Sequence, residues 1–104
     1  MTVSYAKYVD ATITAENNFT DAIVPMKKVN SVGYFNISVE GTFSANVVLQ
    51  RSFDKGVSWY DVATYTAATE TYKEDPEVGV LYRIGVKTGG FTSGSVYVRI
   101  GVAS

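Results

Sequence analysis

Apolar and polar residues alternate along several short stretches of the chain, as expected for β-strands with one buried face. The alternation is cleanest near the C-terminus, where Val96, Val98 and Ile100 point one way and Tyr97 and Arg99 point the other. Further strand-like stretches cover residues 9–15, 19–24, 32–39, 47–53, 59–65 and 78–87. No stretch keeps apolar spacing at the helical period, and branched and aromatic residues are plentiful, so the sequence predicts an all-β protein.

Turn-forming residues separate these stretches. They cluster in residues 16–18, 40–46, 75–77 and 88–94, which predicts a turn or a hairpin connection at each place. Seven or eight short strands joined in this way predict a single antiparallel β-sandwich, Ig-like or jelly-roll-like, over residues 9–104. A small closed barrel is the alternative architecture.

Residues 1–8 have no obvious place in such a sandwich, although they carry Val3, Tyr5 and Tyr8. Short terminal segments are usually disordered unless another element holds them. We therefore expect an N-terminal arm that adds a strand to a neighbour's sheet or lies in a neighbour's groove, which would make the protein a homo-oligomer.

Charged residues raise two questions about the strands. Arg51 shares a strand face with Val47 and Leu49, so it needs a partner or a position near the rim of the core. A small acidic run is predicted to be a solvated loop, because it lacks the regular spacing of calcium ligands. The run consists of Glu70, Glu74, Asp75 and Glu77.

One motif, S-x-D-x-G-x-S-W, occupies residues 52–59 between two strand-like stretches. Ser52 opens it, and Asp54 can accept hydrogen bonds from turn amides. Gly56 can adopt a positive φ, and Trp59 can fold its ring back over the turn. These residues resemble an Asp-box, the hairpin turn that recurs in sialidases and other β-propellers. The resemblance implies a structural turn and no catalytic residue, and a single copy does not predict a propeller.

Composition excludes several kinds of chemistry. The chain has no cysteine and no histidine, which rules out disulfides, thiolate sites and the commonest general base. The net charge of −1 does not favour nucleic acid, and the glycines of residues 85–94 fit a hairpin better than a phosphate-binding loop. We expect no enzyme activity, cofactor or metal. We also expect no signal peptide and no membrane span, hence a soluble protein made in a cytoplasm.

Tyrosine is unusually frequent, with eight residues. Packing on strand faces accounts for most of them, but exposed tyrosines can stack on sugars or anchor a protein partner. The candidates for such a surface are Tyr5, Tyr8, Tyr60, Tyr65 and Tyr72.

The C-terminal half resembles small β-sandwich virion proteins of tailed bacteriophages. The resemblance rests on residues 47–59, on Tyr82-Arg83-Ile84 and on residues 93–100. It implies a non-enzymatic structural part of a particle, assembled in the host cytoplasm. The specific expectation is a capsid decoration (cement) protein that binds the major capsid protein, or a tail or fibre component. A carbohydrate-binding or adhesion module that uses exposed tyrosines is the alternative.

Overall fold

Eight β-strands account for most of the computed structural model, which describes residues 3–4, 7–25 and 33–102. The described residues contain no helix, and the predicted all-β class is confirmed. The strands are β1 (Val3–Ser4), β2 (Tyr8–Ile13), β3 (Asn18–Phe19), β4 (Ala22–Ile23), β5 (Tyr34–Ser52), β6 (Tyr60–Tyr65), β7 (Thr69–Glu74) and β8 (Leu81–Val102).

The two long strands, β5 and β8, form the centre of one sheet. They run antiparallel from the pair Phe35 and Val102 to the pair Ser52 and Leu81, with register shifts on either side of Ala45. β6 and β7 pair with β5, whereas β2, β3 and β4 pair with β8. All of these pairings are antiparallel; β1 joins β4 in the parallel direction.

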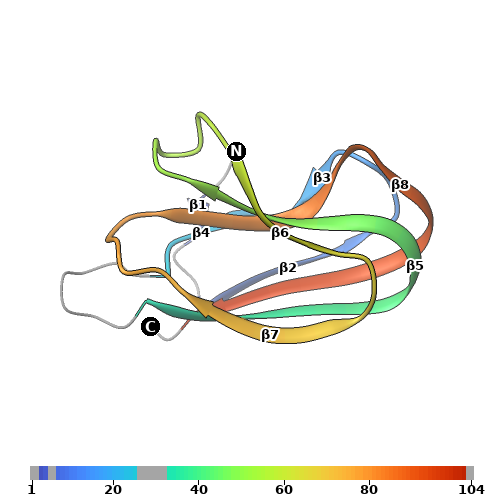
Figure 1. Cartoon of the computed structure of the whole chain (residues 1–104), viewed down its shortest axis with the longest axis horizontal. Helices are drawn as coiled ribbons and strands as arrows, with labels where there is room; N and C mark the ends of the chain where they lie inside the picture. The colour runs from blue at the N-terminus through green and yellow to red at the C-terminus, as the bar shows by residue number, and fades with distance from the viewer. Residues whose placement is uncertain (1–2, 5–6, 26–32, 103–104) are drawn as a thin grey trace.

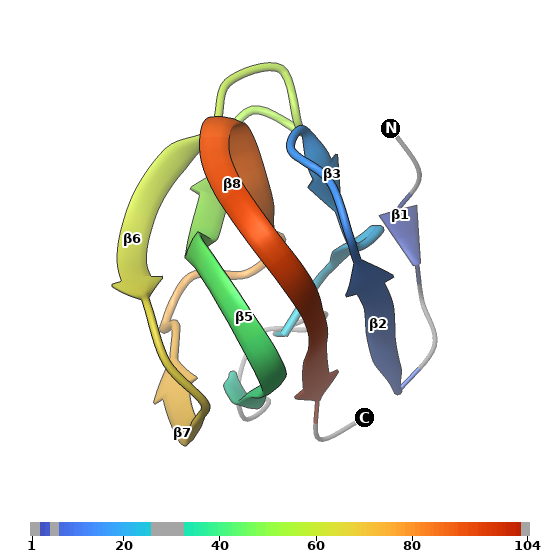
Figure 2. The ribbon, with the colours of Figure 1, turned by 90° about the vertical axis from the view of Figure 1, so that its right-hand side faces the viewer.

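The sheet folds back on itself because β5 and β8 bend together (Figure 1). One half contains β7, the start of β5, the end of β8 and β2; the other contains β6, the end of β5, the start of β8, β3 and β4. Figure 2 shows the bend from outside, with β6 and β7 on one side and β2 and β3 on the other. The two halves therefore face each other across one core.

Inward-facing side chains of both halves fill this core. The first half contributes Val9, Ile13, Phe35, Ile37, Val39, Val96, Val98 and Ile100, and the second contributes Ile23, Val47, Leu49, Tyr82, Ile84 and Val86. All of them are buried. The two-residue period in the sequence is thus the period of burial, as predicted for strands with one face on a core.

The expected turn at residues 40–46 and the expected hairpin at residues 88–94 are both wrong, because β5 and β8 continue through them. Gly41 and Gly94 have φ values of 120° and 93°, which L side chains rarely adopt. Glycine serves a sharp bend within a strand as well as a turn between strands, so composition alone does not distinguish the two.

The expectation that the acidic run forms a solvated loop is wrong for Glu70 and Glu74, because both lie in β7, which pairs with residues 34–39 of β5. Asp75 is not solvated: it is 4% exposed and accepts hydrogen bonds from the Tyr82 hydroxyl at 2.6 Å and the Glu77 amide at 2.9 Å. Burial, followed by the bond to Asp75, raises the pKa of Tyr82 to about 12.

Arg51 has a partner and also lies near the rim of the core, the two possibilities expected for it. Its Nη1 lies 3.9 Å from Asp75 Oδ2, and its side chain is 36% exposed.

The described part of residues 1–8 differs from a free arm. Val3 and Ser4 pair with Ala22 and Ile23, and Tyr8 is already paired with Gly101. These residues belong to the sheet of their own chain, so the expected N-terminal arm of residues 1–8 is not what the structure shows for Val3, Ser4 and Tyr8. Tyr5 lies outside the described residues.

The bend predicts different costs for two glycines of β8. A Cβ on Gly94 would lie 2.7 Å from the Phe43 Cα on β5, whereas a Cβ on Gly89 would meet nothing within 4 Å; both have positive φ. We expect Gly89→Ala to lower the free energy of unfolding by about 1 to 2 kcal/mol, the cost of a left-handed residue. Gly94→Ala should lower it clearly further in urea titrations, and equal losses would contradict the close approach of the strands.

Candidate functional site

The turn at residues 52–59 is held by side chains that bond to its own backbone. The Ser52 hydroxyl donates to Asp54 Oδ1 at 2.8 Å and accepts the Gly56 amide at 2.8 Å. Asp54 Oδ1 also accepts the Ser58 amide at 2.8 Å. The bond from the Ser58 backbone, followed by that from Ser52, lowers the pKa of Asp54, because both favour the charged carboxylate. Gly56 has the expected positive φ, and the neighbouring Lys55, with φ of 60°, has one that the sequence did not indicate.

Trp59 leads from this turn onto the outer face of the second half of the sheet. It packs against a small buried cluster of Ala22, Val24 and Leu81. The expectation that its ring folds back over the turn stays a prediction. The Arg83 Cζ lies 4.3 Å from the centroid of the Trp59 ring and 4.0 Å from that of the Phe19 ring. Trp59 is therefore part of a cover over this outer face.

A chain of polar contacts crosses the same face from β8 to β6. Arg83 Nε donates to Gln50 Oε1 at 2.9 Å, and Gln50 Nε2 donates to Asp61 Oδ1 at 2.9 Å. Lys87 Nζ lies 2.6 Å from Asp61 Oδ2. Lys87, followed by Gln50, lowers the pKa of Asp61, whereas burial lowers the pKa of Arg83.

The outer face of the first half is open and carries tyrosines. Tyr8, Gly101, Asn36 and Tyr72 follow one another across β2, β8, β5 and β7, and Tyr34 lies two residues before Asn36 on β5. Tyr8, Tyr34 and Tyr72 are 48%, 48% and 71% exposed. We call these three tyrosines the tyrosine face.

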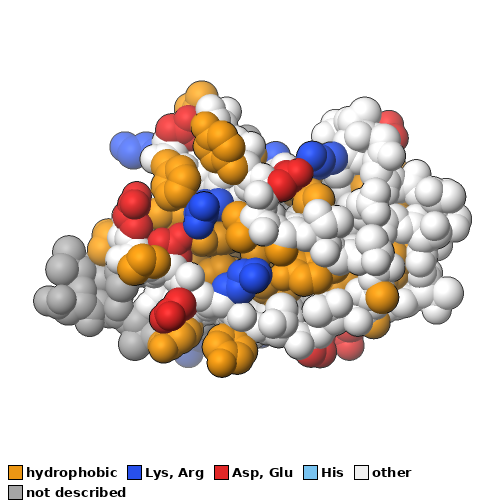
Figure 3. All heavy atoms as spheres, viewed as in Figure 1, with side chains coloured by type: hydrophobic (Ala, Val, Ile, Leu, Met, Phe, Trp, Pro, Cys, Tyr) orange, Lys and Arg blue, Asp and Glu red, His pale blue; other side chains and the backbone are white. Residues whose placement is uncertain are grey.

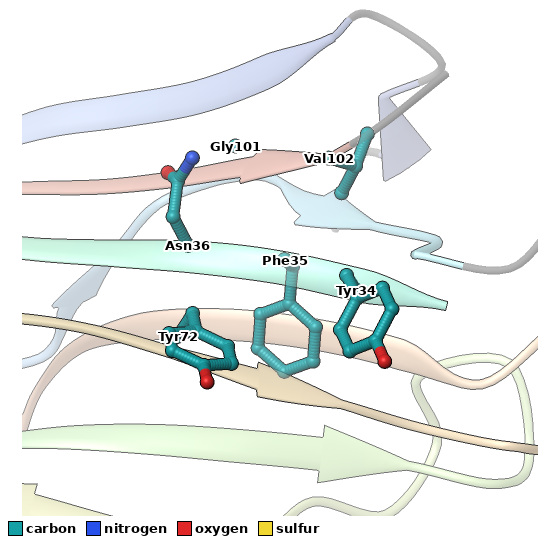
Figure 4. Close-up of a pocket in the computed structure, with 6 residues that line it drawn as sticks. All are labelled: Tyr34, Phe35, Asn36, Tyr72, Gly101 and Val102. Atoms are coloured by element: carbon teal, nitrogen blue, oxygen red, sulfur yellow. The ribbon is translucent and has the colours of Figure 1, made fainter. Parts of the chain in front are cut away.

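A hollow of about 340 Å³ opens on this face (Figure 4). It is lined by Tyr34, Phe35, Asn36, Tyr72, Gly101 and Val102. Arg99 Nη1 donates to Asn36 Oδ1 at 3.0 Å, which fixes the orientation of that amide. The absence of a side chain at Gly101 leaves room for this pair, because a Cβ there would lie 2.7 Å from Asn36 Oδ1 and 2.8 Å from Arg99 Nη1. The hollow therefore combines aromatic walls with one oriented polar group.

The other candidate tyrosines lie elsewhere. Tyr60 is 56% exposed beside the turn, where its ring centroid is 6.4 Å from that of Phe53. Tyr65 is not a surface anchor: it packs against the core, its hydroxyl is buried without a hydrogen-bond partner among the described residues, and burial raises its pKa. The structure thus brings Tyr8 and Tyr72 together and separates both from Tyr60 and Tyr65.

Four exposed apolar residues were not among the candidates from the sequence: Tyr34, Phe53, Val57 and Val78. Tyr34 alternates with buried Phe35, so the two-residue period could have identified it as outward-facing. Figure 3 shows hydrophobic side chains gathered at the upper left, over the turn between β5 and β6, while the bend at the right is mainly uncharged and polar. Among the described residues, the exposed aromatic side chains therefore form two groups, the tyrosine face and the turn at residues 52–59 with Tyr60 beside it.

The turn predicts unequal effects for two of its residues. Ser52 is fully buried and serves both Asp54 and Gly56, whereas Val57 is 83% exposed. We expect Ser52→Ala to lower the free energy of unfolding by about 1 to 3 kcal/mol, since it removes the hydrogen bonds to the Asp54 carboxylate and from the Gly56 amide. Val57→Ala should change it by less than about 0.5 kcal/mol. Thermal and urea unfolding measure both, and a Ser52→Ala variant as stable as Val57→Ala would remove the side-chain bonds from the account.

Among the residues that the structure describes, no three His, Cys, Asp or Glu side chains are grouped so that they could hold a metal ion. The described chain has no helix of the length and hydrophobicity needed to cross a membrane. No family model, no curated protein and no solved structure matches the chain.

Proposed function

We propose that the protein is a non-enzymatic structural component of a bacteriophage particle, most specifically a capsid decoration protein that binds the major capsid protein. The resemblance of residues 47–59 and 93–100 to virion proteins supports this proposal. The proposal includes the finer structural assignments, in which the folded sheet is a β-sandwich and the turn at residues 52–59 is an Asp-box.

The observation that carries the proposal is the tyrosine face. Tyrosine supplies a large contact area at low entropic cost and is enriched among the residues that dominate binding energy. Here Tyr8, Tyr34 and Tyr72 stand on one sheet, and each is paired with a neighbouring strand: Tyr8 with β8, Tyr34 with β7 and Tyr72 with β5. The rings are therefore presented on a rigid surface, which lowers the cost of ordering them on binding.

Self-association is part of the proposal. Among the described strands, β6 and β7 each pair only with β5, so each leaves one backbone edge without a partner strand. Such an edge accepts a strand of another chain. Neighbouring copies on a particle would then strengthen one another's attachment, because linked weak contacts act together.

The hollow on the tyrosine face favours a second candidate, a carbohydrate-binding or adhesion module. Tyr34 and Tyr72 line it with aromatic rings, and Asn36 offers an amide oriented by Arg99. A pyranose ring has an apolar face that stacks on tyrosine and hydroxyls that bond to amides. The volume of the hollow, about 340 Å³, is within the usual range of small-molecule sites, about 300 to 1,000 Å³.

Binding to capsids tests the proposal. The chain is mixed with particles assembled from the major capsid protein of the same genome, and its occupancy is measured after sedimentation. We expect the double variant Tyr34→Ser, Tyr72→Ser to bind at least about tenfold more weakly, because anchor residues typically contribute about 2 kcal/mol or more. The matched control is Tyr60→Ser, which removes an exposed tyrosine outside the tyrosine face.

Unchanged occupancy in the double variant, or no binding of the unaltered chain, would contradict the decoration role. A glycan array with the same three proteins separates the second candidate. Selective glycan binding that the double variant loses, with no capsid binding, would establish the carbohydrate module instead.

A further inference from the structure

Arg83 is a half-buried cation without a carboxylate partner among the described residues. Its one hydrogen bond there is from Nε to Gln50, which is neutral. The described ion pairs join Arg51 to Asp75 and Lys87 to Asp61, and neither involves Arg83. A guanidinium that is partly withdrawn from water and not neutralised by the protein is suited to bind an anion.

The surroundings of Arg83 fix its position. Its guanidinium contacts the Phe19 and Trp59 rings, while Gln50 holds Nε. Gly85 makes this arrangement possible, because a Cβ there would lie 2.7 Å from the Phe19 ring and 2.6 Å from the Phe19 Cα. The Phe19 ring therefore crosses β8 above a residue without a side chain. An arginine held in this way loses little entropy when a ligand binds.

A hollow of about 400 Å³ opens beside Arg83. Its lining is mainly polar and consists of Asn17, Phe19, Gln50, Arg83, Lys87 and Thr88. Arg83 and Lys87 contribute two positive charges, and Asp61, which is bonded to Lys87, contributes one negative charge, so the group carries a net charge of +1 (two minus one). The amide of Asn17 and the hydroxyl of Thr88 add neutral hydrogen-bond donors.

We propose that this hollow is a binding site for a carboxylate, to which Arg83 donates hydrogen bonds and which the positive charge of Lys87 stabilises. With Nε bonded to Gln50, the terminal nitrogens of Arg83 remain to donate to the two oxygens, a planar pairing that suits carboxylates. The Phe19 ring offers an apolar surface to the part of the ligand that carries the carboxylate. A uronic acid sugar and an acidic side chain of a peptide share this chemistry. The site lies on the face opposite the tyrosine face and does not depend on a role in a virion.

Trp59 makes the proposal measurable. It is the only tryptophan in the chain, and its ring lies 4.3 Å from the Arg83 Cζ, so its fluorescence reports on that guanidinium. The full chain is titrated with sodium acetate, sodium glucuronate and N-acetylglutamate amide. Glucose and sodium chloride at matched ionic strength are the controls. We expect a saturable change in Trp59 fluorescence with the carboxylates and none with the controls. Tighter binding of glucuronate than of acetate identifies a uronic acid sugar as the source of the carboxylate, and tighter binding of N-acetylglutamate amide identifies an acidic side chain of a peptide.

Three variants test the assignment of the site. Arg83→Gln should weaken carboxylate binding at least about tenfold, whereas Arg99→Gln, which alters an arginine at the other end of β8, should not change it. Asp61→Asn removes the competing carboxylate from Lys87 and should strengthen binding several-fold, which a purely structural role of Arg83 does not predict. Melting curves of the variants verify folding. No saturable response in the unaltered chain, or no strengthening in Asp61→Asn, would overturn the proposal.

Discussion

The continuous pairing of β5 with β8 is the constraint on which the rest of the structure depends. The two strands stay in contact from Phe35 and Val102 to Ser52 and Leu81, and they bend together instead of separating into hairpins. Every other strand except β1 attaches directly to one of them. The bend requires close approach of the two backbones, and Gly41 and Gly94 allow it, since each has a positive φ and faces the opposite strand directly.

This arrangement gives the sheet two outer faces with different properties. On the second half, outward-facing Val48 and Gln50 of β5 are each 4% exposed, and Trp59 closes a small cluster on the same side. On the first half, alternate residues reach solvent, and Tyr34 and Tyr72 are exposed. One face therefore contains the half-buried Arg83 and the other exposes tyrosine rings, so the proposed carboxylate site and the proposed partner surface lie on different halves.

The sequence predicted the parts of the fold that follow a strict two-residue period. Val96, Val98 and Ile100 face the core as expected, and all three are fully buried in it. The two-residue period could not predict β7, because its residues at the edge of the sheet are alternately partly exposed and exposed. They form no apolar face that would identify the strand. Nor could it place Asp75, whose burial depends on Tyr82 and Arg51, residues brought to it only by the folded sheet. The same holds for the site, since Tyr34 and Tyr72 become neighbours through the register of β5 with β7.

Cross-strand nuclear Overhauser effects at the bend test the central claim most directly. The account predicts backbone contacts between Thr42 and Ser95 and between Ser44 and Ser93, as strong as those between Val39 and Val98 in the first half. If residues 40–46 instead formed a turn, contacts would appear within that segment and the Thr42–Ser95 and Ser44–Ser93 contacts would be missing. That result would contradict the folded sheet, and with it the separation of the two outer faces.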